Sequence, residues 1–447
     1  ADQDLDVNAG GSVRVLAQRT EHRQERFQQD RSSGVFGSGA GLTLGSQQRS
    51  SEQNASGSGA AGSTLGSLQG NVNIHAGQTY EQVGSDLLAP QGDIEVHAQA
   101  ARVSDARTGE RRWQQDKMSQ SGFTVGLSGA PVQAMQGFAD TVEALGKTDD
   151  RRLQALGAAT AGLQVQQGMG AAAQAQGNGD ATGGAGVNFS VGASSSRSTS
   201  EGSADSAQGS RVYAGGNVTF IAEGAGQDSD IQVRGSELNA GRTVHLKAEG
   251  NVDLGAAQNT VQERTESENR SGSVGIGWQL GGANSGWGVT ASASAGRGHA
   301  EGQAISHTNT HVTAADKVVV ESGGDTTLDG AVISAPRIEG DVQGDLHIES
   351  LQDRASYHER SRQAGGSVSF GANAGGASFS SGATDIHSEY ASVTEQSGMR
   401  AGDGGFDVRV KGKTVLKGGA ITSTQAALEE GRNHFASDGG VELQDVQ

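Results

Sequence analysis

Gly344-Asp345-Leu346-His347-Ile348 is the stretch of this sequence that decides the fold, because close copies of it recur along the chain. In each copy, a glycine and an Asn or Asp precede a short segment in which apolar and polar residues alternate. The other copies are Gly70-Asn71-Val72-Asn73-Ile74, Gly216-Asn217-Val218-Thr219-Phe220 and Gly250-Asn251-Val252-Asp253-Leu254. Internal repetition of this kind predicts a solenoid built from stacked units.

The composition favours stacked coils over a conventional globular core. The chain has 447 residues, of which 72 are Gly, 33% are hydrophobic and only 4% are aromatic. Stacked coils suit such a chain, since each buries a few aliphatic side chains against similar neighbours. Disorder is the alternative for a Gly-rich chain of net charge −18. The regular alternation of Val, Ile and Leu exceeds what a disordered chain needs.

Charge, cysteine content and hydropathy narrow the possible partners and location. The chain carries 51 Asp and Glu against 33 Lys and Arg, which argues against nucleic acid as a partner. It contains no Cys, a feature that fits export through an oxidising space. No apolar run reaches the ~18 residues that a membrane-spanning helix needs. We expect both ends to be cut from a longer repeat array.

The repeats predict an all-β fold, a right-handed parallel β-helix. Core segments are expected at about 1–20, 65–105, 211–262, 310–352 and 400–430, with ~20 residues per coil and a rod of ~40 Å. Alternation places one side chain in two toward the interior. The residues predicted to point inward are Val72, Ile74, Val218, Phe220, Val244, Leu246, Val252, Leu254, Val318, Val320, Leu346 and Ile348.

Polar, Gly-rich insertions interrupt the core at 21–64, 106–210, 263–309 and 353–399. Each opens with a charged run, continues with an alternating stretch, turns at glycines and returns with a second alternating stretch. This order predicts a long antiparallel hairpin extruded from the rod. The second insertion also contains apolar residues at helical spacing within 131–176, which predicts a helical hairpin at its tip. These helices are either surface helices that pack on each other or a pair that binds a membrane or a partner.

Several longer motifs stand out along the chain, namely Gly216-Asn217-Val218, Arg270-Ser271-Gly272-Ser273-Val274-Gly275, Asn309-Thr310-His311-Val312, Ser322-Gly323-Gly324-Asp325-Thr326-Thr327-Leu328 and Gly344 to Asp353. These motifs closely resemble the haemagglutinin repeats of filamentous haemagglutinins. They also resemble, more narrowly, the second haemagglutinin-repeat region of exoproteins that carry contact-dependent growth-inhibition toxins. The likeness covers nearly the whole chain, and Ile348 to Asp353 is its most specific part.

The resemblance implies a secreted or cell-surface protein of a Gram-negative bacterium, which is exported by an outer-membrane two-partner transporter and held in the periplasm before delivery. In such toxin carriers, this region follows a receptor-binding region and precedes a C-terminal toxin in the same polypeptide. It is thought to enter the outer membrane of the target bacterium and to help pass the toxin into the periplasm. In plain filamentous haemagglutinins, similar repeats are associated with adhesion.

No residue pattern in the sequence indicates catalysis or a bound cofactor. His307 and His311 are four residues apart, but they lie in a strand-like context where that spacing does not converge two ligands on a metal. Gly224 to Asp228 and Gly402 to Asp407 faintly resemble calcium-binding coils, yet neither recurs in tandem, and turn chemistry explains both. We therefore expect a non-enzymatic protein with no metal site and no cofactor.

Two functional hypotheses remain open. In the first, the hairpins form a membrane conduit or a membrane-inserting assembly, because their strands place apolar residues on one face. In the second, the region is a passive stalk or an adhesin. Trp278 and Trp287 fit either hypothesis, as interface anchors or as cover for a soluble hairpin. The proposed membrane-facing positions are Phe123, Val125, Leu127, Val187, Phe189, Val191, Val274, Ile276, Trp278, Leu280, Val368 and Phe370.

Overall fold

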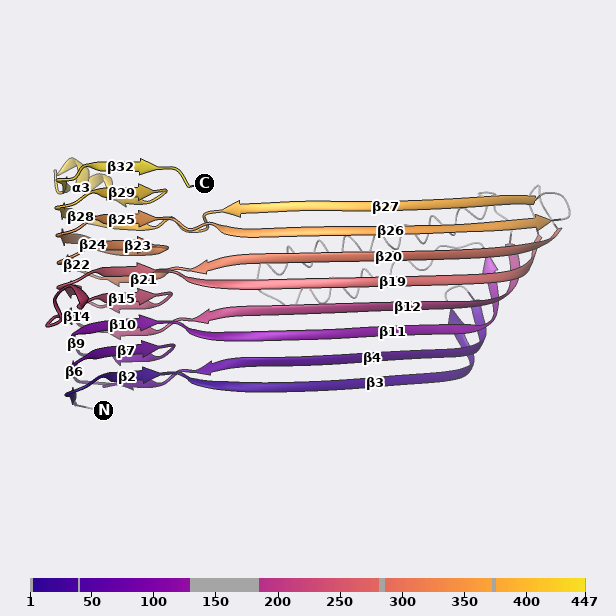
Figure 1. Cartoon of the computed structure of the whole chain (residues 1–447), viewed down its shortest axis with the longest axis horizontal. Helices are drawn as coiled ribbons and strands as arrows, with labels where there is room; N and C mark the ends of the chain where they lie inside the picture. The colour runs from indigo at the N-terminus through magenta and orange to yellow at the C-terminus, as the bar shows by residue number, and fades with distance from the viewer. Residues whose placement is uncertain (1–2, 39–40, 129–184, 281–285, 372–374, 447) are drawn as a thin grey trace.

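Short strands stacked in parallel form a rod, and long strands project from one side of it (Figure 1). The computed structural model describes residues 3–38, 41–128, 185–280, 286–371 and 375–446. The helical insertion expected at 131–176 lies outside these residues. Within them, the chain is a parallel β-helix with extruded hairpins, which confirms the predicted fold class.

The rod has three faces, and each coil contributes one strand to each face in turn. Face 1 contains β1 (Leu5–Ala9), β6 (Val72–Ala76), β9 (Ile94–Ala98), β14 (Val218–Ala222), β17 (Thr243–Ala248), β22 (Lys317–Ser322) and β31 (His434–Ser437). Face 2 contains β2 (Val13–Leu16), β7 (Thr79–Val83), β10 (Ala100–Ser104), β15 (Ile231–Arg234), β18 (Val252–Gly255), β23 (Thr326–Asp329), β25 (Leu346–Glu349), β29 (Thr414–Lys417) and β32 (Val441–Gln444). Face 3 contains β5 (Thr64–Gly66), β8 (Asp86–Ala89), β13 (Arg211–Ala214), β16 (Glu237–Ala240), β21 (Thr310–Ala314) and β30 (Ala420–Thr422).

Two longer strands, β24 (Ala331–Val342) and β28 (Gly398–Val410), run round a corner of the rod and join face 3 to face 1. A short 3-10 helix, η1 (Gly226–Asp228), and the helix α3 (Gln425–Glu429) lie in the connections between strands. In the described part of the chain, face 2 stacks nine strands. At ~4.8 Å per strand this corresponds to a rod of roughly 38 Å, close to the length expected from the sequence.

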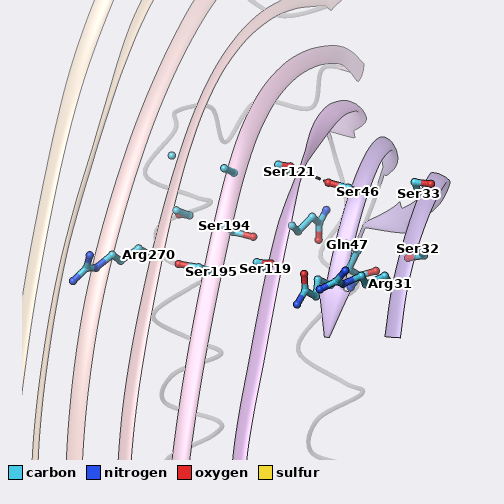
Figure 2. A pocket seen from close by; sticks show the side chains of 15 residues that line it. Arg31, Ser32, Ser33, Ser46, Gln47, Ser119, Ser121, Ser194, Ser195 and Arg270 are labelled. Carbon is cyan, nitrogen blue, oxygen red and sulfur yellow. Dashed lines mark hydrogen bonds between the residues drawn. The ribbon is translucent and has the colours of Figure 1, made fainter. Parts of the chain in front are cut away.

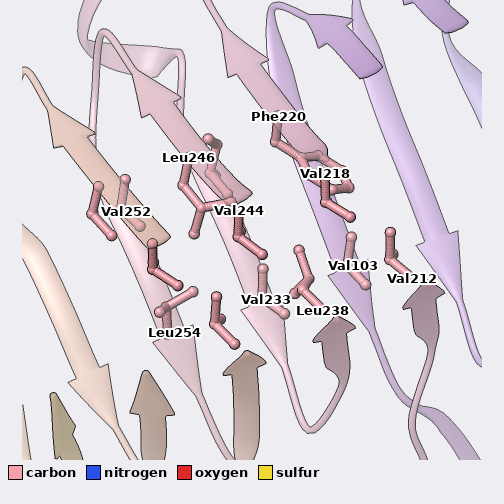
Figure 3. Packing of buried hydrophobic residues seen from close by; sticks show 14 of the residues in the cluster. Val103, Val212, Val218, Phe220, Val233, Leu238, Val244, Leu246, Val252 and Leu254 are labelled. Carbon is pink, nitrogen blue, oxygen red and sulfur yellow. The ribbon is translucent and has the colours of Figure 1, made fainter. Parts of the chain in front are cut away.

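The interior of the rod is a continuous aliphatic core. All twelve residues predicted to point inward are buried, each with at most 2% of its surface exposed. Each residue stacks against its equivalent in the next coil, as Val218 does against Val244 (Figure 3). This stacking arises because parallel strands in register align their side chains. Burying one such side chain contributes roughly 1.5–3 kcal/mol, so the stack supplies the stability that the few aromatic residues cannot.

Asn and Asp side chains at the turns join each coil to the next. Asp325 Oδ1 accepts a hydrogen bond from the backbone N–H of Asp345 at 2.8 Å. At another corner, Asp93 Oδ1 accepts one from the backbone N–H of Asn217 at 2.6 Å. A Cβ atom on Gly344 would lie 2.1 Å from Asp325 Oδ1, so only glycine leaves room for this contact. The Gly-Asn and Gly-Asp repeats therefore mark the positions where side-chain hydrogen bonds join successive coils.

Among the described residues, four hairpins pair side by side into a separate antiparallel sheet, which we call the hairpin sheet. Its strands are β3 (Gln18–Ser38), β4 (Gly41–Ala61), β11 (Ala106–Ser128), β12 (Ala185–Gln208), β19 (Ala257–Leu280), β20 (Gly286–Thr308), β26 (Asp353–Gly371) and β27 (Gly375–Ser392). They are hydrogen-bonded in the order β27-β26-β20-β19-β12-β11-β4-β3, antiparallel throughout, as Figure 1 shows. The charged runs that open the insertions are themselves part of these strands, and β19 begins at Ala257 rather than at 263.

Hairpins and tight turns alternate from coil to coil. Each hairpin leaves the rod after a face 2 strand and returns to a face 3 strand. The coils in between turn the same corner at a glycine with positive φ, namely Gly84 (54°), Gly235 (54°), Gly330 (71°) or Gly418 (61°). A Cβ atom on Gly235 would lie 2.3 Å from the Cβ of Ala257, the first residue of the neighbouring hairpin. The glycine corners therefore set both the backbone path and the packing at the hairpin roots.

We expect Leu246→Asp to destabilise the chain by about 3–5 kcal/mol, because an unpaired carboxylate would lie between apolar coils. Denaturant unfolding followed by far-UV circular dichroism measures this effect. Lys247→Asp is the control, since Lys247 is exposed in the same strand. Equal losses for the two variants would contradict the buried core.

We expect Gly235→Ala to cost about 2–4 kcal/mol, since a left-handed backbone is strained for alanine and the methyl group would overlap Ala257. Gly431→Ala is the matched control, because Gly431 also has a positive φ (67°) but no atom lies within 4 Å of the position of its Cβ. The difference between the two unfolding free energies measures the packing at the hairpin root. No difference would show that this packing contributes nothing.

Candidate functional site

Apolar side chains line up in rows across the end of the hairpin sheet that lies farthest from the rod. Residues directly opposite each other in an antiparallel sheet carry their side chains on the same face. The first row contains Leu44, Phe123, Val191, Val274, Ala291 and Val368. The second row, two residues nearer the tips, contains Phe189, Ile276, Val289 and Phe370. We call the surface formed by these two rows and Trp287 the apolar tip face.

The apolar tip face is exposed in the described structure. Val191, Val274 and Phe370 are 61%, 60% and 67% exposed. The rings of Phe123 and Phe189, which are diagonal neighbours on paired strands, stack with centroids 6.0 Å apart. Contiguous exposed apolar surfaces of this kind mark sites of interaction with a partner or a membrane.

The pairing of the hairpins brings the sequence-predicted positions together. Seven of the twelve have described side chains and lie on the apolar tip face, namely Phe123, Phe189, Val191, Val274, Ile276, Val368 and Phe370. The backbone register also pairs Val125 with Phe189, Leu127 with Val187, Val187 with Trp278, and Leu280 with Ala185. The side chains of Val125, Leu127, Val187, Trp278 and Leu280 lie outside the described set.

Sequence reasoning missed Leu44 and Val289, which complete the rows on the returning strands β4 and β20. The available signal was their alternation with Thr43 and Thr290, the same pattern that marked the other strands.

The opposite face of the hairpin sheet carries small and polar residues at the same level. Ser190, Thr290 and Ser369 lie between the apolar rows, and their side chains point to the other side. Serine hydroxyls pair across neighbouring strands there, as between Ser273 and Ser292 at 2.8 Å. The end of the sheet is therefore two-faced, apolar on one side and hydroxyl-rich on the other.

Toward the rod, the face that carries the apolar rows becomes polar. Next to those rows lies a hollow of about 630 Å³, and Figure 2 shows serine side chains between Arg31 at one side and Arg270 at the other. Ser46 and Ser121 hydrogen-bond across it at 3.1 Å.

Beyond the hollow, ion pairs cover the surface of the sheet. Arg264 and Glu266 pair at 2.7 Å along one strand. Arg360 and Asp385 pair at 2.9 Å across two strands, and Arg360 lowers the pKa of the Asp385 carboxyl group. Such exposed pairs contribute little stability, so they act mainly to solvate the sheet.

Buried acids hold the hairpin roots on the rod. The Asp105 side chain is 1% exposed, and its carboxylate lies 2.9 Å from Arg234 and 3.5 Å from Arg107. Asp353 accepts a hydrogen bond from the backbone N–H of His307 at 2.8 Å. Asp329 differs, because its Oδ1 atom is buried with no hydrogen-bond partner among the described residues. Burial, followed by the neighbouring charge of Glu349, raises the pKa of Asp329.

In the described part of the chain, no three His, Asp or Glu side chains gather in a way that could hold a metal ion. No helix among the described residues is long and apolar enough to cross a membrane.

Residues 191–365 match the family described as the hemagglutinin repeat. This chain is also 35% identical over 440 residues to the tRNA nuclease CdiA of Escherichia coli strain NC101. The aligned region covers 96% of this chain and 13% of that protein. The deoxyribonuclease CdiA of Yersinia pseudotuberculosis is 34% identical over 96% of the chain and 40% of its own length. This is a CdiA-type haemagglutinin-repeat region.

The family match and the CdiA relatives confirm the resemblance drawn from the sequence. The 16S rRNA endonuclease CdiA of Enterobacter cloacae is also 35% identical, over 95% of the chain and 13% of that protein. The chain therefore spans 13–40% of the length of these CdiA proteins. No solved structure matches it. The relatives indicate a secreted or cell-surface protein of a Gram-negative bacterium.

We expect Asp329→Asn to raise the melting temperature of the CdiA-type region at pH 7. The raised pKa in the folded state means that the ionised carboxylate destabilises the fold above the unfolded-state pKa of ~3.9. The cost is full above the folded-state pKa, declines as pH falls from that pKa toward ~3.9, and is lost below ~3.9, where both states are protonated. Thermal unfolding at pH 7 and pH 3.5 should show a stabilisation at pH 7 that vanishes at pH 3.5. The exposed Asp341→Asn is the control, and a gain that persists at pH 3.5 would contradict the electrostatic explanation.

Proposed function

We propose that this CdiA-type region is a non-enzymatic module of a secreted contact-dependent growth-inhibition exoprotein. It engages the outer membrane of the target bacterium and helps to translocate a C-terminal toxin into the periplasm. Its partners are that membrane, the toxin in the same polypeptide and, during export, an outer-membrane two-partner transporter. Periplasmic holding before delivery belongs to the same proposal.

The names of the relatives support a non-enzymatic role. They describe a tRNA nuclease, a 16S rRNA endonuclease and a deoxyribonuclease, yet all three are 34–35% identical to this chain. Similarity to this chain therefore does not follow the kind of nuclease. A shared module that precedes different toxins accounts for this pattern.

The apolar tip face is the observation that carries the membrane role. Its rows extend across strands from all four hairpins, lie at the end remote from the rod and are exposed. A strand that enters a bilayer needs apolar side chains on its lipid-facing side and tolerates small polar ones on the other. Both conditions hold where Val274 and Ile276 alternate with Ser273 and Gly275.

A passive stalk or adhesin is the second candidate, and the ion-paired part of the hairpin sheet favours it. This part is a broad, well-solvated surface with charged or polar pairs on both edge strands, such as Arg23 with Glu25 on β3 and His387 with Glu389 on β27. A stalk has no requirement for the apolar tip face, however, and the two candidates therefore predict different consequences of altering it.

We expect the double variant Phe189→Arg/Ile276→Arg to lose membrane insertion, because each arginine costs ~2–4 kcal/mol at a bilayer midplane. Dye release from vesicles and toxin delivery by the full-length exoprotein are the measurements. Ser369→Arg is the matched control, since Ser369 is exposed on the opposite face of the same end of the sheet. If the double variant binds target cells and delivers toxin at the normal rate, the stalk is the better description.

A further inference from the structure

A band of cationic side chains crosses the hairpin sheet on the same face as the apolar rows, closer to the rod. Six Lys and Arg residues lie in two adjacent rows, which contain Glu268 as their only acid among the described residues. Six cations and one carboxylate leave a net charge of about +5 in a chain whose total is −18. We call these residues the cationic band, and they are Arg31, Lys117, Arg197, Arg270, Arg297 and Arg362.

The cationic band is not explained by folding. Lys117 lies directly opposite Arg197, and Arg297 directly opposite Arg362, in pairings that destabilise a sheet. Lys117 and Arg197 are exposed, and no hydrogen bond or ion pair joins them to another described residue. Arg362 is also exposed and forms no ion pair among the described residues, although its charge helps to lower the pKa of Asp385. Arg270 and Arg297 both pair with Glu268, at 3.4 Å for Arg297. One carboxylate therefore serves six cations, which leaves an excess of positive charge suited to an anionic ligand.

The cationic band lies on the rod side of the apolar rows, which is the side that headgroups would meet if the tips entered a leaflet. At ~3.4 Å per residue, the apolar segment from Phe123 to Leu127 is roughly 14 Å long, close to the ~15 Å of hydrocarbon in one leaflet. Arg31 and Arg270 lie one row inside Ser121, about four residues from Phe123, and flank the serine-lined hollow (Figure 2). Long arginine side chains extend toward an interface and reach the phosphates there. Lys117, Arg197, Arg297 and Arg362 follow in the next row.

We propose that the cationic band binds the phosphate groups of anionic lipids and sets the depth at which the apolar tip face enters a leaflet. This inference rests on the proposed function, whose membrane it describes in chemical terms. The opposite face at the same level offers no comparable charge, since Arg49 there is balanced by Asp30. The sheet therefore presents headgroup and hydrocarbon contacts on one face only.

Vesicle binding by the 447-residue chain tests the proposal. The variant Lys117→Gln/Arg197→Gln/Arg362→Gln removes the three cations of the band that form no ion pair with another described residue. The control Arg26→Gln/Arg49→Gln/Arg112→Gln removes the same charge from exposed positions on the opposite face. Each cation near an anionic surface contributes roughly fivefold, so the band variant should bind phosphatidylcholine vesicles with 30% phosphatidylglycerol about 100-fold more weakly. The control should change by less than about fivefold, and binding to pure phosphatidylcholine should not change.

Two further readouts keep the result interpretable. The band variant should melt at or above the wild-type temperature, because a repulsive pair is removed, and 0.5 M NaCl should weaken wild-type binding to a similar extent. Equal losses for the band and control variants would reduce the effect to net charge and overturn the proposal, as would wild-type binding by the band variant. In both of these cases, the proposed function is still supported if Phe189→Arg/Ile276→Arg abolishes dye release. Normal dye release by that variant would instead overturn the proposed function.

Discussion

The equal spacing of coils and paired strands is the constraint on which the rest of this structure depends. A β-helix rises by one strand spacing per coil, ~4.8 Å, and a hairpin is two strand spacings wide. A hairpin on every second coil therefore fills the height of the rod with strands and leaves neither gaps nor overlaps. Hairpins on consecutive coils would collide, and hairpins on every third coil would leave strand edges unpaired. The glycine corners at Gly84, Gly235 and Gly330 are the local device that enforces this alternation.

The sequence predicts the rod well because the pattern that defines each coil lies within a short, continuous segment of the chain. Alternation within a strand decides which side chains are buried, and this was sufficient to identify Val72, Leu246 and Ile348 as core residues. The sequence also predicts that hairpins exist, since a Gly turn between two alternating stretches is a local signal. It does not predict that the hairpins pair with each other. Ser121 and Ser46 are 75 residues apart, and only the height of two coils brings their strands together.

The charged runs were harder to place for a related reason. Glu21 to Arg31 has no apolar alternation, so nothing in its pattern distinguishes a strand from a solvated loop. The structure makes it a strand because its backbone groups pair with β4, whose other edge pairs with β11. Tertiary pairing here overrides the low strand propensity of Glu and Asp. The same strand pairing brings the residues of the apolar tip face together. Phe123, Phe189 and Ile276 become neighbours only because three separate strands are in register.

Stability and interaction are separated in space in this molecule. No described residue of the hairpin strands belongs to the aliphatic core cluster, and the apolar residues that the strands bury, Ala106 and Ala257, lie at the roots. The hairpin sheet is therefore held by its backbone hydrogen bonds and by its attachment to the rod. A sheet with one exposed apolar face gains free energy when that face leaves water, at roughly 25 cal/mol per Å². Because the rod keeps its own core throughout, a change in the environment of the tips leaves the coils intact. This separation allows one part of the chain to bind an apolar phase while another keeps the eight strands in register.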